Sequence, residues 1–308
     1  MLRVAFFPGK PKWSPDHLPD LSTKVFLVTG GNTGIGKETV KRLLMKNAKV
    51  YLAARSKEKA TRAIEELREE TGKEALFLQL DLSDLNAVKK AAEEYKQRES
   101  QLDVLYLNAG VLYPPPAAQI TPQGYEGTIG TNVIGHFLLM RLLYPLLAAS
   151  GQKDDPSRIV WLSSMSSFRP SKLTYEAYRE GPVQKKTDPF DLYSESKLAA
   201  VVLSNHLAKT CTKDNVITVA VDPGNIQTEI YRDDSPWILK LWDRIISCPV
   251  TWGALSSLWA GAAPEGASLN GKYIEPWARV HAPNALALDV REQEKLWTWV
   301  EEQAKPYL

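Results

Sequence analysis

The most constraining feature of this sequence is a regular alternation of short, apolar, β-branched runs with longer stretches of helical periodicity. The first run, residues 24–29, is almost continuously apolar, as expected for a strand covered on both faces. Further strands are predicted at residues 50–54, 75–80, 104–107, 158–162, 217–221 and 271–274. Helices are predicted at residues 37–47, 57–71, 83–98 (capped by Ser83), 131–147, 193–210 and 252–262. This alternation predicts an α/β fold with a doubly wound parallel sheet, covered by helices on both faces as a three-layer αβα sandwich.

The chain is predicted to form one domain. Its 308 residues are 44% apolar and 24% charged, which is typical of a globular domain with a large core. Residues 1–20 are rich in proline and are expected to form an N-terminal arm, whereas no linker divides residues 21–308. Residues 245–264 carry no charge, but Pro249 and several small polar residues interrupt them, which favours a buried helix over a membrane span.

The charge balance and the cysteines exclude several kinds of partner. The 38 Lys and Arg residues nearly match the 36 Asp and Glu residues, so no broad field favours nucleic acid or an anionic membrane. The N-terminal stretch is too short and too interrupted for a signal peptide. Cys211 and Cys248 lie far apart, without His or Cys at ligand spacing, which argues against a disulfide scaffold or a Cys-based zinc site. We therefore expect a cytoplasmic protein without a bound metal.

A glycine-rich turn follows the first predicted strand and leads directly into a helix. Residues 29–36 read TGGNTGIG. Glycines at such a turn permit the tight bend, the close approach of a pyrophosphate and close packing of helix on strand. The helix N-terminus adds N–H groups and a positive dipole end for the phosphates. Because the spacing differs from G-x-G-x-x-G, a turn without a ligand is the alternative, but the strand–turn–helix context favours a dinucleotide. The expected contacts are Gly30, Asn32, Thr33, Gly34, Ile35 and Gly36.

The end of the second predicted strand indicates which dinucleotide binds. An NAD site places Asp or Glu there, about twenty residues after the glycines, to bind the ribose. This sequence has Ala53, Ala54 and Arg55 instead. The neutral residues remove repulsion of a 2′-phosphate, and the Arg55 guanidinium can bind one. The pattern favours NADP over NAD; the alternative is that Arg55 is an ordinary solvated cation.

Tyr193 and Lys197 are spaced i, i+4 at the predicted start of a helix, so both lie on one face. An ammonium beside a phenol favours the phenolate, which makes a tyrosine a workable general acid or base near neutral pH. The alternative is a solvent-facing pair, because this spacing often occurs by chance. Ser163 and Ser164 follow the strand 158–162, at the sheet edge where ligands bind in such folds.

The sequence has no G-x-S-x-G motif, which argues against a Ser/His/Asp hydrolase. The histidines, His17, His136, His206 and His281, are expected to be ordinary surface or core residues.

Together these motifs resemble the short-chain dehydrogenase/reductase family, in the branch with a T-G-x-x-x-G-x-G turn. The resemblance extends from about residue 20 to about residue 274, with the motifs in the family's order. It implies a Rossmann fold and a catalytic tetrad of Asn132, Ser164, Tyr193 and Lys197, with Ser163 as the alternative serine. It also implies cofactor contacts to the adenine (Asp81, Leu82), along the cofactor (Asn108, Ala109, Gly110) and to the nicotinamide amide (Pro223, Gly224, Ile226, Thr228).

The resemblance gives each member of the tetrad a role. Tyr193 would pass its proton to the developing alkoxide as hydride arrives from the nicotinamide, or accept it in the reverse direction. Lys197 would bind the nicotinamide ribose and lower the tyrosine pKa. Ser164 would orient the carbonyl, and Asn132 would hold a water that relays protons to Lys197. The protein would supply positioning and electrostatics, because the hydride chemistry belongs to the cofactor.

Two features depart from the common family pattern. Leu107 stands where many members have Asn, which we interpret as a packing variation. Residues 165–192 lengthen the spacing between the serine and the tyrosine, as in the retinol-dehydrogenase-like branch. The entry to the first strand, the start of the first helix and the Ala54–Arg55 pair resemble soluble fungal members of that branch, without the apolar N-terminal helix of membrane-anchored relatives.

The resemblance also implies a substrate lid at about residues 225–262. This segment contains Ile230, Tyr231, Trp237, Ile238, Leu241 and Trp242. Aromatic walls suit an apolar or aromatic carbonyl or alcohol; the alternative is that these side chains pack against the C-terminal helices. Trp297 and Trp299 are expected in the core or at a subunit contact. Family members are often dimers or tetramers, which is compatible with a homodimer, although the sequence assigns no interface.

The leading hypothesis is an NADP-dependent oxidoreductase that transfers a hydride between nicotinamide and the carbonyl or alcohol of an apolar small molecule. Reduction of a ketone or aldehyde is the favoured direction. A cofactor-binding regulator or scaffold without turnover is the alternative, and the complete tetrad argues against it. A sugar-nucleotide epimerase or dehydratase is disfavoured by the glycine spacing and the short lid.

Overall fold

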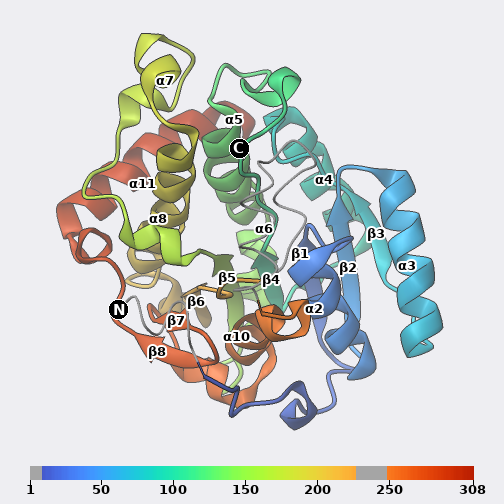
Figure 1. The fold of residues 1–308 in the computed structure, drawn as a ribbon. Helices are drawn as coiled ribbons and strands as arrows, with labels where there is room; N and C mark the ends of the chain where they lie inside the picture. Colours follow the sequence, from blue (N-terminus) through green and yellow to red (C-terminus); the bar gives the residue numbers. More distant parts are fainter. Residues whose placement is uncertain (1–8, 227–247) are drawn as a thin grey trace.

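The computed structural model describes residues 9–226 and 248–308. At its centre is one eight-stranded sheet with the order β3-β2-β1-β4-β5-β6-β7-β8 (Figure 1). Strands β1 to β7 pair in parallel, and β8 pairs antiparallel with β7. The strand order reverses between β1 and β4, which is where open α/β sheets bind ligands. The strands are β1 (Val25–Thr29), β2 (Lys49–Ala54), β3 (Leu76–Gln79), β4 (Val104–Leu107), β5 (Ser157–Leu162), β6 (Val216–Val221), β7 (Tyr273–Glu275) and β8 (Arg279–His281).

Helices cover both faces of the sheet, as the sequence predicts (Figure 1). In β1, Val25 and Leu27 pack in the same core cluster as α4, α6, α8 and α11. Phe26 and Val28 point the other way, into a second cluster with α2, α3 and α10. This alternation of side chains explains why the strand is apolar throughout. The helices are α2 (Gly34–Met45), α3 (Lys57–Thr71), α4 (Leu85–Arg98), α5 (Gly127–Ile129), α6 (His136–Ser150), α7 (Pro182–Lys186), α8 (Pro189–Leu207), α10 (Val250–Ala262) and α11 (Val290–Ala304).

The seven predicted strands are confirmed within two residues of their predicted ends, whereas several predicted helix starts are wrong. α2 begins at Gly34 and not at residue 37, and the helix predicted from residue 131 lies in a helical stretch that already begins at Gly127. α8 begins at Pro189, before Tyr193, because the Asp188 carboxylate accepts a backbone N–H of the first turn and proline suits the first helical position. Ser83 does not cap α4; it donates its N–H and its hydroxyl to Asp81. The cap of α4 is the next residue, Asp84.

Two elements near the C-terminus, β8 and α11, are absent from the sequence-based prediction. α11 begins after the capping residue Asp289 and packs against α8. Trp297 lies edge-on to the ring of Phe137, with ring centroids 5.0 Å apart. Trp299 packs in the same way on Tyr178, at 5.4 Å. The prediction that these tryptophans contribute to the core is therefore confirmed.

A long apolar helical stretch runs from Gly127 to Ser150. By length and composition it is the one helix in the described residues that could cross a membrane. Its side chains fill the core instead: Phe137, Leu138 and Leu139 are fully buried against the sheet. A π-helical turn, Gly130–Gly135, separates α5 from α6 within this stretch. The predicted burial of residues 252–262 is also confirmed, because α10 packs into the second core cluster.

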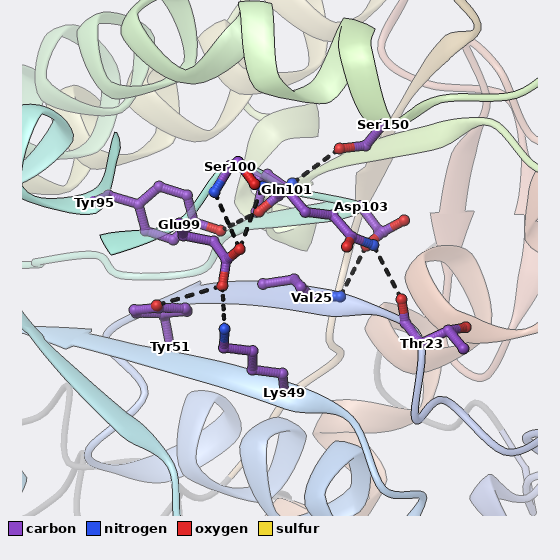
Figure 2. A network of polar contacts seen from close by, with 11 residues as sticks. Thr23, Val25, Lys49, Tyr51, Tyr95, Glu99, Ser100, Gln101, Asp103 and Ser150 are labelled. Carbon is purple, nitrogen blue, oxygen red and sulfur yellow. Dashed lines mark hydrogen bonds and ion pairs between the residues drawn. The ribbon is translucent and has the colours of Figure 1, made fainter. Parts of the chain in front are cut away.

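A network of polar contacts lies at the amino edge of the sheet, around the connection from α4 to β4 (Figure 2). The carboxylate of Glu99 accepts hydrogen bonds from the Lys49 ammonium and from the backbone N–H of Gln101. Asp103 accepts from the backbone N–H of Val25 (2.8 Å) and from the Gln101 side chain (2.7 Å). The network orders the amino ends of β1, β2 and β4.

Candidate active site

The predicted site residues gather at the opposite, carboxyl edge of the sheet. Parallel strands bring their carboxyl ends to one edge, so loops far apart in the sequence meet there. The loops that carry these residues follow β1 (30–36), β2 (Arg55), β3 (Asp81, Leu82), β4 (108–110), β5 (163–164) and β6 (223–226). Thr228 and the predicted lid residues from Ile230 to Trp242 lie outside the described residues.

The glycine-rich turn after β1 has an open side and a closed side. Gly30 and Gly34 have positive φ angles of 66° and 53°, which other residues adopt only with strain. A Cβ atom on Gly34 would meet nothing within 4 Å, whereas one on Gly36 would lie 2.3 Å from the Gly30 carbonyl oxygen. Gly36 therefore permits the close packing of α2, and Gly34 leaves space above the turn. The first turn of α2 carries no acidic side chain, so its positive dipole end suits an anion.

The residues predicted for the adenosine end differ in exposure. Arg55 is exposed at the end of β2, directly after the buried Ala53 and Ala54. One carboxylate oxygen of Asp81 accepts from the N–H (3.0 Å) and the hydroxyl (2.6 Å) of Ser83. In the glycine-rich turn, Thr33 is exposed, Asn32 is half-buried and Ile35 is buried. Leu82, in the loop after β3, is also buried.

The turn after β4 connects the glycine-rich turn with the predicted tetrad. The Asn108 side chain donates to the carbonyl oxygen of Thr29 at 2.8 Å. A Cβ atom on Gly110 would lie 3.2 Å from the Lys197 ammonium nitrogen and 3.5 Å from the side-chain oxygen of Asn132. Glycine at this position therefore lets the turn approach both tetrad members closely.

Asn132 lies in the π-helical turn, and its side chain ties three segments together. Its oxygen accepts from the backbone N–H of Val111 at 2.9 Å. Its amide group donates to the carbonyl oxygen of Val111 and to the hydroxyl of Ser196, both at 3.1 Å. Ser196 in turn donates to the carbonyl oxygen of Tyr193, at 2.7 Å. The carboxamide thus fixes the loop after β4 and the π-helical turn against α8.

Tyr193 and Lys197 lie on one face of α8, as their spacing predicts. The Lys197 ammonium nitrogen is 5.6 Å from the centroid of the Tyr193 ring. It donates to the carbonyl oxygen of Leu162 at 3.0 Å, and the residue is only 4% exposed. Burial lowers the pKa of Lys197 to about 8, and the negative charge of Asp222 opposes this shift. The site therefore holds a cation whose hydrogen-bond acceptor is a neutral carbonyl group.

The two serines after β5 have different contacts. Ser163 is only 1% exposed, and its hydroxyl donates to the backbone carbonyl of Lys197 at 2.8 Å. The Ser164 hydroxyl oxygen accepts from the backbone N–H of Ser166 at 3.2 Å, and this bond does not use the hydroxyl proton. Ser163 is therefore committed to holding α8 against β5, which favours Ser164 as the serine that contacts a substrate.

Comparison with known proteins identifies the family. A model of the short chain dehydrogenase family matches residues 24–178. A short-chain dehydrogenase/reductase of Armillaria gallica is 45% identical over 99% of this chain and 98% of its own, and one of Phomopsis amygdali is 36% identical over 98% and 96%. This chain belongs to the short-chain dehydrogenase/reductase family, and it is an oxidoreductase.

Two solved structures show the same fold. An uncharacterised protein of Mycobacterium paratuberculosis is 26% identical, with a TM-score of 0.74 over 95% of this chain and 97% of that chain. The Pseudomonas aeruginosa protein RhlG, solved with NADP, is 24% identical, with a TM-score of 0.67 over 86% of this chain and 98% of its own. The sheet order described above is therefore that of a Rossmann-like short-chain dehydrogenase/reductase.

Two buried ionisable residues contact the site of this oxidoreductase and are absent from the sequence-based prediction of the site. Asp222 precedes the Pro223–Gly224 turn and accepts from the Gly224 backbone N–H at 2.9 Å. Burial raises the pKa of Asp222 to about 6. The other residue is His136, which is expected from the sequence to be an ordinary surface or core residue. Its position four residues after Asn132, on one helix face, was the available signal.

Proposed function

We propose that this chain is an NADP-dependent enzyme that reduces the carbonyl group of an apolar aldehyde or ketone, or oxidises the corresponding alcohol. The observation that carries the proposal is the buried ammonium group of Lys197 on the face of α8 that bears Tyr193. Burial of a cation without a carboxylate in contact is unfavourable, and such groups cluster at functional sites. The family membership makes a nicotinamide-linked oxidation or reduction the chemistry to expect there.

The residues at the carboxyl edge fit a dinucleotide. The space above Gly34 and the unopposed dipole of α2 suit the pyrophosphate. Gly110 keeps the middle of the edge clear in front of Lys197. Structures of related proteins from Pseudomonas aeruginosa and Burkholderia cenocepacia contain NADP, and one from Brucella melitensis contains NADH. NADPH, when bound, supplies the hydride.

Arg55 is the basis for preferring NADP. Its guanidinium is exposed at the end of β2, where it can bind a 2′-phosphate in a bidentate manner. Ala53 and Ala54 before it are buried and uncharged, so no carboxylate stands at this point of β2 to repel the phosphate or bind a free ribose hydroxyl.

The tetrad residues then divide the proton chemistry. Tyr193 donates its phenolic proton to the substrate oxygen as negative charge develops there. The Lys197 ammonium favours the resulting phenolate by its charge. Ser164 donates its hydroxyl proton to the same substrate oxygen. The Asn132 carboxamide is engaged with Val111 and Ser196, so we assign the water-holding role to its backbone carbonyl.

We place the substrate in a cavity beside the start of α8, whose lining is part apolar and part polar or charged. It has a volume of about 560 Å³ and lies between the loop after β4 and the segment before Tyr193. Tyr113, Pro114, Ile120 and Leu192 contribute apolar surface, and polar groups such as Gln184 and Lys185 line the other part. Residues 184–192 belong to the insertion that resembles the retinol-dehydrogenase-like branch, and we place the chain in that branch on this basis.

The test measures binding and turnover separately. NADPH and NADH are titrated by nucleotide fluorescence, and NADPH oxidation is then followed with a panel of aldehydes and ketones of increasing apolar length. The Tyr193→Phe variant is measured in parallel, with Tyr51→Phe, at the opposite amino edge of the sheet, as a control that removes a hydroxyl outside the site. We expect Tyr193→Phe to retain NADPH binding and to lose at least about 100-fold in turnover, the lower end for general acid–base catalysis.

Each outcome has a distinct meaning. NADPH binding without turnover of any carbonyl would favour the regulator or scaffold, and retained turnover in Tyr193→Phe would remove Tyr193 from its role. Tighter binding of NADPH than of NADH, weakened selectively by Arg55→Ala, supports the assignment of NADP. Equal affinity for the two nucleotides would contradict it.

A further inference from the structure

Of the histidines in the described residues, His136 is the most deeply buried. Each of its ring nitrogens has a hydrogen-bond partner. The residue is 2% exposed at the start of α6. Its Nδ1 atom lies 3.1 Å from the backbone carbonyl oxygen of Asn132. Its Nε2 atom lies 2.9 Å from the hydroxyl oxygen of Thr29, the last residue of β1. One imidazole ring therefore joins the strand that leads into the glycine-rich turn to the helix that carries Asn132.

The contacts determine the tautomer of the ring. A carbonyl oxygen can only accept, so Nδ1 must carry the proton that is donated to Asn132. Nε2 then has only a lone pair and accepts the hydroxyl proton of Thr29, which has a longer alternative at 3.2 Å, the carbonyl oxygen of Tyr106. Burial lowers the pKa of His136 to about 3, and the charge of Lys197 acts in the same direction, so the ring is neutral at physiological pH.

The hydroxyl of Thr29 extends this chain of bonds to the turn after β4. Its oxygen accepts the backbone N–H groups of Asn108 and Ala109, both at 2.9 Å. With the hydroxyl proton directed at His136, the two oxygen lone pairs are available for these two N–H groups. The imidazole thereby orients the turn that continues to Gly110, in front of Lys197.

The π-helical turn explains why the bond from His136 Nδ1 to the Asn132 carbonyl oxygen matters. In a regular α-helix the backbone N–H of residue 136 would bind the carbonyl oxygen of residue 132. Here the His136 backbone N–H bonds to Val133 instead, and the Asn132 carbonyl oxygen accepts from the imidazole. The side chain of His136 thus replaces a main-chain contact at the carbonyl group that we assign to holding water.

We propose that His136 is a positioning residue, whose neutral imidazole couples the cofactor-lining turns to the backbone carbonyl of Asn132. Its Nε2 contact orders Thr29 and the turn 108–110, which affects nucleotide binding. Its Nδ1 contact orders Asn132, which affects the proton-transfer step. The inference rests on the proposed oxidoreductase function, and its two contacts make separable predictions.

Three substitutions separate the two contacts. In His136→Asn the side-chain amide can still donate to the Asn132 carbonyl but cannot reach Thr29. In His136→Gln the amide oxygen can reach Thr29 but the donor to Asn132 is lost. His136→Leu removes both contacts and keeps the apolar volume. His206→Leu is the matched control, because His206 stacks on Trp297 at the far end of α8, away from the tetrad.

NADPH dissociation constants are measured by nucleotide fluorescence, and kcat and KM for the best carbonyl substrate are measured at saturating NADPH. We expect His136→Leu to weaken NADPH binding about 3- to 10-fold and to lower kcat about 10-fold, with little change in KM for the carbonyl. His136→Asn should recover kcat but not NADPH affinity, and His136→Gln should recover affinity but not kcat. His206→Leu should leave both unchanged.

A second measurement tests the bond between Thr29 and His136 by changing Thr29. Thr29→Val removes the hydroxyl with little change in volume, so Thr29→Val and His136→Leu should weaken NADPH binding less than additively when combined, because they share one contact. If circular dichroism shows that His136→Leu fails to fold, His136→Asn, which also lacks the contact to Thr29, replaces it in this cycle, and the comparison of His136→Asn with His136→Gln is unaffected.

The outcomes distinguish this inference from the proposed function. Wild-type NADPH affinity and kcat in a folded His136→Leu variant would overturn the inference while the enzyme remained active. Parallel losses of affinity and kcat in all three variants, in proportion to lost thermal stability, would reduce His136 to a core residue. Absence of turnover in the wild type would contradict the proposed function, and the NADPH titrations and the double-mutant cycle would still test the contact to Thr29.

Discussion

The amino and carboxyl edges of the sheet differ in whether their charged side chains form ion pairs. At the amino edge, the Glu99 carboxylate is paired with Lys49 (Figure 2). Asp103 is paired with Lys24. At the carboxyl edge, the Lys197 ammonium donates to a carbonyl oxygen, and no ion pair to it is found among the described residues. The pKa of Glu99 is accordingly held low by its partners, while burial lowers the pKa of Lys197. The amino edge is arranged for stability, whereas the carboxyl edge retains a destabilising charge where the chemistry is proposed.

The comparison is tested most strongly by removing the carboxyl-edge charge. Lys197→Met should lower turnover by at least about 100-fold, because the group that favours the phenolate is lost. The same substitution should raise the free energy of unfolding of the nucleotide-free protein by about 1–3 kcal/mol, because the unfavourable burial of the ammonium group is removed. Steady-state kinetics and urea unfolding measure the two effects.

The exposed Lys209, just beyond α8, provides a control for that substitution. Lys209→Met should change neither turnover nor stability appreciably. A loss of stability in Lys197→Met comparable to that of an average core substitution would contradict the claim that the carboxyl edge stores an unfavourable charge.

The pH dependence of stability gives the next largest effect. The pKa of Lys197 falls from 10.5 in the unfolded chain to about 8 in the folded protein. Below pH 8 both states are protonated and the full penalty applies; between pH 8 and 10.5 only the folded state loses the proton, so its relative stability rises. The difference in unfolding free energy between the wild type and Lys197→Met should therefore shrink by about 3 kcal/mol across this window. A difference that stays constant with pH would exclude Lys197 as its source.

At the amino edge, removal of a charge should have the reverse effect. Asp103→Ala removes the acceptor for the Val25 N–H, the Gln101 amide and the Lys24 ammonium. We expect a loss of about 2–3 kcal/mol in the free energy of unfolding, as for hydrogen bonds to a buried charged group, with kcat unchanged for the folded enzyme. Asp154→Ala, at an exposed aspartate, should be neutral. If Asp103→Ala lowered kcat by more than its loss of folded protein explains, the amino edge would contribute to turnover as well as to stability.

The smallest effect is expected at the surface of the same network. The Lys49 side chain is 47% exposed, although its ion pair with Glu99 raises its pKa. Lys49→Ala should reduce the free energy of unfolding by at most about 1 kcal/mol, because solvent screens such pairs. The loss should become smaller in 1 M salt, where the Debye length is about 3 Å. An unchanged loss at high salt would indicate that packing of the lysine stem, rather than its charge, is responsible.

Local patterns in the sequence are sufficient for much of the fold. Continuous apolar runs mark the strands because both faces of the sheet are covered, and the i, i+4 spacing of Tyr193 and Lys197 places them on one face of α8 wherever the helix begins. The start of α8 itself was predictable from the Asp188–Pro189 pair, which is a local capping signal. For His136, the spacing from Asn132 was a local signal, but the contact with Thr29 was not predictable, because Thr29 is 107 residues away in the sequence.

The sequence by itself determined the α/β architecture, the glycine-rich turn and the pairing of a tyrosine with a lysine one helical turn apart, because these depend on periodicity and backbone freedom within a few residues. The tertiary structure decided which hydroxyl after β5 is already committed, and it showed how a histidine and an aspartate join the carboxyl edge. Hydrogen bonding and desolvation are set by neighbours in space, and the loops that meet at a sheet edge are far apart along the chain.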